Sequence, residues 1–193
     1  MTGPIAADAE VSAATHAWAR RVRRVGGFIQ TGFAGFWLLR GGLTVGAPTG
    51  TALAAAGGLA TAAVLVYGIR RTAHRAPRPT GAEARSIERA ITIATIVQLA
   101  ASFAAPAVVL ALGRDDWVLP SIAVTIGPLL LWLDRRLSIP RYRPVGWLLI
   151  AGPVVLVALT SGTTLAVSTG IGAGALLLAT ATAGFHDLDR RAT

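Results

Sequence analysis

The side chains best suited to catalysis or metal binding are few in this chain and lie far apart. The three histidines are His16, His74 and His186, and none has a second ligand at the spacing of a His-Glu-x-x-His zinc site. The chain has no cysteine, which excludes disulfides, thiolate metal sites and Cys nucleophiles. It also lacks a Gly-x-Ser-x-Gly elbow and a Walker-type phosphate loop. These residues therefore predict no catalytic residue, no bound metal and no cofactor.

The acidic residues give little more support for an enzyme. Asp115 and Asp116 belong to a short polar turn, where they are expected to be solvated. A membrane enzyme acting on lipid would require ionisable groups such as Asp134, Arg135 and His186 to converge at one membrane interface. A proton-coupled transporter usually requires a buried carboxylate, and no acidic pair lies inside a long apolar run.

Four polar side chains inside apolar runs are candidates for lining a path: Arg40, Gln30, Gln98 and Ser102. Arg40 is the one charge well inside an apolar run, where it could contact an anion or snorkel to the nearby surface. Gln98 and Ser102 are four residues apart, so they share one helix face. Such a face either lines a substrate path or forms hydrogen bonds between helices, and the second use is the more common.

Prolines and glycines form a second pattern inside the apolar runs. Pro106, Pro128 and Pro153 are candidate helix kinks, because proline removes a backbone donor. Transporters use broken helices in paired positions, although proline is also tolerated in ordinary membrane helices. Gly170 and Gly174 form a small-xxx-small face for close helix packing, either on another helix of the chain or on a second copy.

Composition places all these residues in a membrane protein. The chain is 53% hydrophobic and 14% charged, whereas a soluble domain carries roughly 25% charged residues. A hydrocarbon core of about 30 Å is crossed by about 20 helical residues. We therefore predict an all-α polytopic integral membrane helix bundle, with six transmembrane helices arranged as three hairpins. The predicted spans are 26–46, 51–69, 90–112, 117–133, 145–159 and 163–185.

The spans leave two short flanking segments. Residues 1–25 form an N-terminal segment, which is either an amphipathic helix on the inner membrane surface or an unstructured tail. A double arginine before an apolar stretch also leaves a signal peptide open. Residues 186–193 form a C-terminal tail. We predict that residues 26–185 are the transmembrane domain and that no separate soluble domain exists.

Arginine distribution predicts the orientation. Sixteen of the 18 basic residues, all of them arginine, lie in the two flanks and the even-numbered connections. Basic loops stay in the cytoplasm, so both termini are predicted to be cytoplasmic, in the inner (plasma) membrane. The net charge of +9 could indicate nucleic acid, but these arginines lie between apolar runs. The expected partners are therefore the lipid bilayer and a membrane protein or second copy, with no nucleic acid.

The stretch LGRDDWVLPSIAVTIGPLLLWLDRRLSIPRY, residues 112–142, resembles small multi-spanning bacterial membrane proteins of unknown function. In these, an apolar span ends in Gly-Arg-x-x-Trp. A Pro-initiated span with a central Gly follows, and then a basic loop that ends in an aromatic residue. The resemblance implies a membrane protein but no activity, so it carries no catalytic residues over.

Together these features predict a non-enzymatic membrane protein, a scaffold or an accessory subunit. A small transporter or permease-like protein is the alternative, and a membrane enzyme acting on lipid is the third. Transport predicts a polar cavity at mid-depth reached by Gln30, Arg40 or Gln98. A scaffold predicts a closed interior with small residues facing outward.

Overall fold

The chain folds into a bundle of six long α-helices. The structure is a computed structural model that describes the backbone of residues 4–72 and 81–190 and the side chains of residues 15–72 and 81–187. The helices are α1 (Pro4–Leu43), α2 (Thr49–Arg71), α3 (Ala82–Ala111), α4 (Val118–Leu137), α5 (Tyr142–Leu159) and α6 (Gly162–Arg190), with a 3-10 turn η1 (Asp115–Trp117) before α4. The described residues contain no strand, so the predicted all-α bundle is confirmed.

Five of the helices are long and apolar enough to cross a membrane: α2, α3, α4 with η1, α5 and α6. The composition and these five helices together indicate a membrane protein. The first helix, α1, is not among the helices that meet these criteria of length and mean hydropathy. Its apolar half contains the polar residues Gln30 and Arg40. Crossing of the membrane by α1 therefore remains a prediction.

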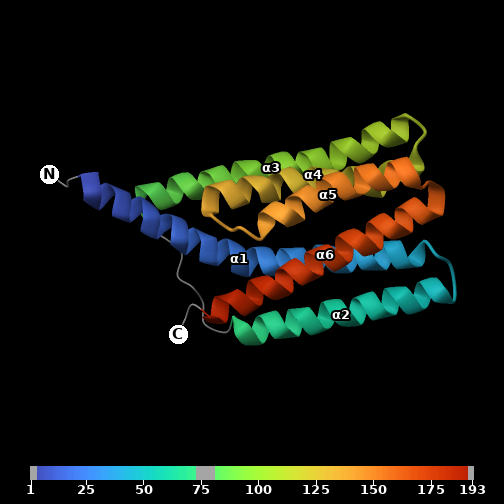
Figure 1. The fold of residues 1–193 in the computed structure, drawn as a ribbon, viewed down its shortest axis with the longest axis horizontal. Helices are drawn as coiled ribbons and strands as arrows, with labels where there is room; N and C mark the ends of the chain where they lie inside the picture. The colour runs from blue at the N-terminus through green and yellow to red at the C-terminus, as the bar shows by residue number, and fades with distance from the viewer. Residues whose placement is uncertain (1–3, 73–80, 191–193) are drawn as a thin grey trace.

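Consecutive helices run in alternate directions, so both ends of the chain lie at the same end of the bundle (Figure 1). We call this the terminal end. The pairs α1–α2, α3–α4 and α5–α6 are in contact, as three hairpins require. The most extensive contact, however, joins α1 to α6, the first helix to the last. Figure 1 shows α6 crossing α1, with one end of α6 beside α5 and the other beside α2, so that α6 contacts α1, α2, α4 and α5.

The N-terminal segment belongs to the same helix as the first apolar run. The α1 helix continues without a break from Pro4 to Leu43, so no boundary falls between residues 25 and 26. The indole Nε1 of Trp18 donates a buried hydrogen bond of 2.9 Å to the Ala84 carbonyl of α3. This bond fastens the extension to the bundle. The side chains before Thr15 lie outside the described residues, as do residues 1–3 and 191–193.

Glycines set the spacing between α1 and α6. A β-carbon built on Gly170 would lie 2.7 Å from the Cα of Gly41, and one on Gly174 would lie 2.7 Å from the Cγ of Leu38. The predicted small-residue face of α6 therefore packs on α1 of the same chain. Such close approach of two backbones is what small residues permit in a membrane, where packing replaces the hydrophobic effect.

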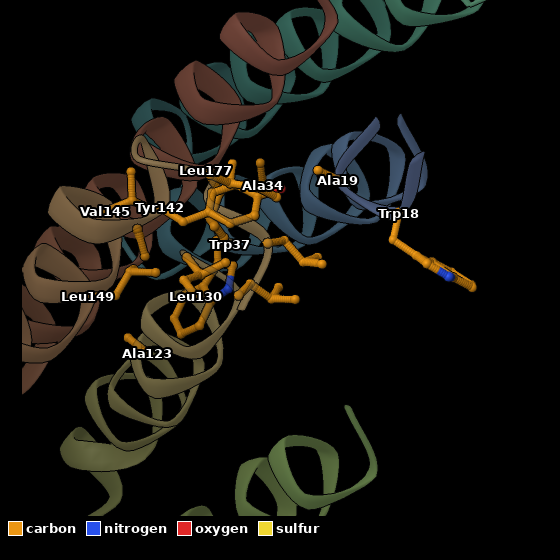
Figure 2. Close-up of a cluster of buried hydrophobic side chains, with 14 of the residues drawn as sticks. Trp18, Ala19, Ala34, Trp37, Ala123, Leu130, Tyr142, Val145, Leu149 and Leu177 are labelled. Atoms are coloured by element: carbon orange, nitrogen blue, oxygen red, sulfur yellow. The ribbon is translucent and has the colours of Figure 1, made fainter. Parts of the chain in front are cut away.

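Bulky side chains fill the middle of the bundle. The indole of Trp37 on α1 is fully buried together with Leu130 of α4, Leu149 of α5 and Leu177 of α6 (Figure 2). This cluster joins α1 to the three consecutive helices α4, α5 and α6, and it fills the space between them where a central pathway would have to run.

None of the three predicted kink prolines ends its helix. Pro106 lies inside α3, Pro128 inside α4 and Pro153 inside α5, and each helix continues on both sides of its proline. Membrane helices tolerate proline in this way because neighbouring groups compensate for the lost backbone hydrogen bond. The glycine before Pro128 has a packing role. A β-carbon on Gly127 would lie 2.6 Å from the carbonyl oxygen of Gly146 on α5.

Candidate functional site

A lateral groove with a volume of about 590 Å³ lies between α1, α3 and α4. Its apolar walls include Phe33 and Phe36 of α1 and Phe103 of α3, all of which are exposed. The complete lining is Phe28, Ile29, Gly32, Phe33, Phe36, Gln98, Leu99, Ser102, Phe103, Ile122 and Ile126. Since these exposed side chains lie on apolar helices, the groove opens sideways toward lipid.

A row of hydrogen-bonded polar side chains follows the α3–α4 side of this groove. Gln98 Nε2 donates to the Ser102 hydroxyl at 2.8 Å, and Ser102 Oγ lies 2.8 Å from Thr125 Oγ1 on α4. The Thr125 hydroxyl donates its proton to the Ile122 carbonyl at 2.7 Å. Ser102 must therefore be the donor to Thr125. The row runs in one direction, from Gln98 through Ser102 and Thr125 to a backbone carbonyl.

This row ties α3 to α4 and leaves Gln98 with unused capacity. A glutamine amide offers two N–H donors and a carbonyl oxygen with two lone pairs. Within the described part of the chain, the Gln98 side chain makes one hydrogen bond, the one to Ser102. Gln98 is also one of the residues that line the groove. Hydrocarbon cannot satisfy such groups, so the site favours a ligand that can hydrogen-bond.

The structure does not bring the four predicted path residues together. Gln98 and Ser102 line the groove, but Gln30 is buried and its side chain lies beside that of Tyr142 on α5. Arg40 is exposed, one turn before the end of α1 at Leu43, where its side chain can reach the membrane surface.

Ion pairs connect the helices at the terminal end. Arg141 Nη2 donates to Asp187 Oδ2 at 2.7 Å, which joins the start of α5 to the end of α6. Arg143 Nε donates to Asp134 Oδ2 at 2.9 Å, which joins α5 to α4. The Asp134 side chain is almost completely buried, whereas that of Arg143 is largely exposed. These contacts stabilise the way the helix ends meet.

The ionisable groups that a lipid-acting enzyme would have to bring together do not contact one another in the structure. Asp134 pairs with Arg143, and His186 Nδ1 lies 3.4 Å from the Tyr67 hydroxyl of α2. Among the described residues, no hydrogen bond or ion pair joins Asp134, Arg135 and His186. No group of three His, Asp or Glu side chains able to hold a metal occurs in this part of the chain either.

Sequence reasoning missed Thr125 and the aromatic wall of α1. Ile29, Phe33 and Phe36 follow helical spacing, so the sequence contains the signal for one shared face. It contains no signal that this face borders α3. Thr125 is one of many threonines in the apolar runs, and only its distance to Ser102 distinguishes it.

No family model, curated protein or solved structure matches this chain. The resemblance of residues 112–142 to small bacterial membrane proteins therefore remains a prediction.

Proposed function

We propose that this protein is a non-enzymatic membrane scaffold or accessory subunit that receives a transmembrane helix of a partner protein in the lateral groove. The observation that carries the proposal is the amide of Gln98, which borders the groove with donor and acceptor capacity to spare. Acyl chains offer no hydrogen-bonding group, whereas a transmembrane helix offers polar side chains and carbonyl groups.

The shape of the groove supports a helix as the occupant. A β-carbon added to Gly32 on the α1 wall would meet nothing within 4 Å, which leaves room for close approach. Around it, Phe33, Phe36 and Phe103 provide a broad apolar contact surface. Small residues beside large apolar ones are the usual composition of helix interfaces in membranes.

The surroundings of the other polar residues support a scaffold over a transporter. Transport would require Gln30, Arg40 or Gln98 to reach a polar cavity at mid-depth. Gln98 does line the lateral groove, but apart from Gln98 and Ser102 that groove is lined by apolar residues and glycine. Gln30 is instead buried beside Tyr142, Arg40 lies at the exposed end of α1, and the fully buried Trp37 fills the bundle centre. Small residues also face outward, as a scaffold predicts, and a β-carbon on Gly58 of α2 would meet nothing within 4 Å.

We also propose that the protein lies in the inner (plasma) membrane and that its terminal end faces the cytoplasm. The support is the positive-inside rule. The described residues at this end include Arg20, Arg21, Arg70, Arg71, Arg135, Arg136, Arg141 and Arg143, and the opposite connections contain only Arg114, beside Asp115 and Asp116.

Site-specific photo-crosslinking in living cells tests the docking proposal. The photoreactive residue p-benzoylphenylalanine replaces Phe103 in the groove or, as a control, Leu59, which is equally exposed on α2. We expect an adduct to the transmembrane segment of one other protein from position 103 and none from position 59. Adding Gln98→Leu should lower the yield roughly threefold, the effect of one interhelical hydrogen bond in a membrane.

Two results would count against the proposal. Adducts from position 103 with lipid alone would mean that the groove is part of the ordinary lipid-facing surface. Adducts with a second copy of this chain would mean that the groove serves homo-oligomerisation and not the binding of a different protein.

A further inference from the structure

A second depression lies on the other side of the molecule, between α2 and α6, with a volume of about 650 Å³. On α6 it is lined by Ala175, Ala179 and Ala183, which follow one another at successive turns of one face, and it ends at His186. Tyr67 of α2, Leu178 and Thr182 complete the lining. We call this depression the α2–α6 trench. Because the three residues along its floor are alanines, no bulky side chain of α6 interrupts that floor.

The length of the trench matches one leaflet of a bilayer. From Ala175 to His186 the helix rises about 16 Å. The hydrocarbon core is about 30 Å thick, so one leaflet contributes about half of that. A single lipid chain that enters from one surface needs only the length observed here.

Groups suited to a lipid phosphate gather at the terminal end of the trench. The Tyr67 hydroxyl and His186 Nδ1 are 3.4 Å apart, and the Arg71 guanidinium lies 5.4 Å from the centre of the Tyr67 ring. Arg70 is also exposed in this last turn of α2. The carboxylate that follows His186, Asp187, is paired with Arg141 at 2.7 Å. Among the described residues of this region, Arg70, Arg71 and Arg141 outnumber the carboxylate of Asp187, and the Tyr67 hydroxyl and the His186 ring lie beside them.

We propose that the α2–α6 trench binds one anionic phospholipid from the leaflet at the terminal end. One acyl chain lies over Ala175, Ala179 and Ala183. The phosphate lies against Arg71, Tyr67 and His186, where guanidinium groups supply charge-assisted hydrogen bonds. An anionic lipid binds better than a zwitterionic one, because a polybasic surface gains about 1 kcal/mol for each arginine near anionic headgroups. This site is separate from the groove of the proposed function.

Native mass spectrometry of the full chain in detergent tests the proposal. The protein is titrated with phosphatidylglycerol and, in parallel, with phosphatidylcholine of the same acyl chains. We expect one molecule of phosphatidylglycerol to be retained in preference to phosphatidylcholine. Arg71→Gln should weaken phosphatidylglycerol binding about fivefold, and Arg71→Lys should restore most of it. Ala179→Phe, which fills the trench from an exposed position, should lower retention to the phosphatidylcholine level.

Matched controls separate this site from general effects. Arg89→Gln and Ala107→Phe change equally exposed positions on α3 and should leave retention unchanged. Equal retention of the two lipids, or equal losses in the test and control variants, would overturn the proposal. A dimer that Ala179→Phe converts into monomer would also overturn it, because a second copy would then occupy the trench. Crosslinking from position 103 is independent of these results, so each proposal can fail alone.

Discussion

Gly41 of α1 and Gly170 of α6 are in close backbone contact, so a β-carbon built on Gly170 would lie 2.7 Å from the Cα of Gly41. This contact joins the first helix of the chain to the last. It brings two backbones together without intervening side chains, and the most extensive helix contact of the bundle forms around it.

A methyl group at Gly170 should therefore destabilise the bundle. Gly170→Ala places its β-carbon against backbone, which cannot move aside as a flexible side chain would, and such overpacking costs about 1–3 kcal/mol. Gly172→Ala is the control on the same helix, because its β-carbon would meet nothing within 4 Å. Alanine also favours helix over glycine, so this variant should be neutral or slightly stabilised. The midpoints of thermal unfolding of the two variants are measured in detergent. Equal midpoints would contradict the close packing of Gly170 on Gly41.

The hydrogen bond between Trp18 and Ala84 should hold the N-terminal extension of α1 on α3. Trp18→Phe keeps an aromatic ring but removes the indole donor, and the loss of one such bond costs about 1 kcal/mol. Trp147→Phe, at an exposed position on α5, should have little effect. Limited proteolysis of the first 25 residues is the measurement. The extension should be cut faster in Trp18→Phe, and unchanged rates would show that this contact does not hold it.

The bond between Ser102 and Thr125 should couple α3 to α4 energetically. Ser102→Ala and Thr125→Val each interrupt the row of hydrogen bonds that begins at Gln98. Polar contacts between membrane helices are worth about 0.6 kcal/mol on average, so a double-mutant cycle in unfolding free energy should give a coupling of about that size. Strictly additive effects would mean that the two hydroxyls do not interact.

Removing Arg143 should cost more than removing Asp187, although both residues form ion pairs. The Asp134 carboxylate is almost fully buried, so Arg143→Ala leaves it without its ion-pair partner, at a cost of about 1–3 kcal/mol. In the other pair Asp187 is 44% exposed, and Asp187→Asn should cost less than about 1 kcal/mol because water screens the pair. Chemical unfolding gives the loss of unfolding free energy in each variant. A larger loss in Asp187→Asn than in Arg143→Ala would contradict the burial of Asp134.

The absence of cysteine permits a clean test of orientation. Single cysteines at Ala47, Arg78 and Ser138 are treated in intact cells with a maleimide that cannot cross membranes. We expect labelling of Ala47→Cys from outside, and labelling of Arg78→Cys and Ser138→Cys only after permeabilisation. Labelling of Ser138→Cys in intact cells would show that the orientation is opposite to the one proposed.

Several features of the fold follow from the sequence alone. Long runs such as 163–185 contain no ionisable residue, and each of the six predicted ranges overlaps its own helix, although 26–46 extends past the end of α1 at Leu43. The gap between the predicted spans 145–159 and 163–185 also corresponds to the end of α5 and the start of α6. These predictions succeed because hydrophobic length and helix propensity are local properties, which add up residue by residue along the chain.

Tertiary structure decided which faces meet. The small-residue motif at Gly170 and Gly174 was visible in the sequence, but the choice of α1 as its partner was not. Likewise, Gln30 and Gln98 look alike as polar residues in apolar runs, yet one is buried beside Tyr142 and the other borders an open groove. The physical reason is that helix pairing in a membrane depends on the fit of shapes and hydrogen-bonding groups between distant segments, and hydrophobicity, which every helix shares, cannot select among them.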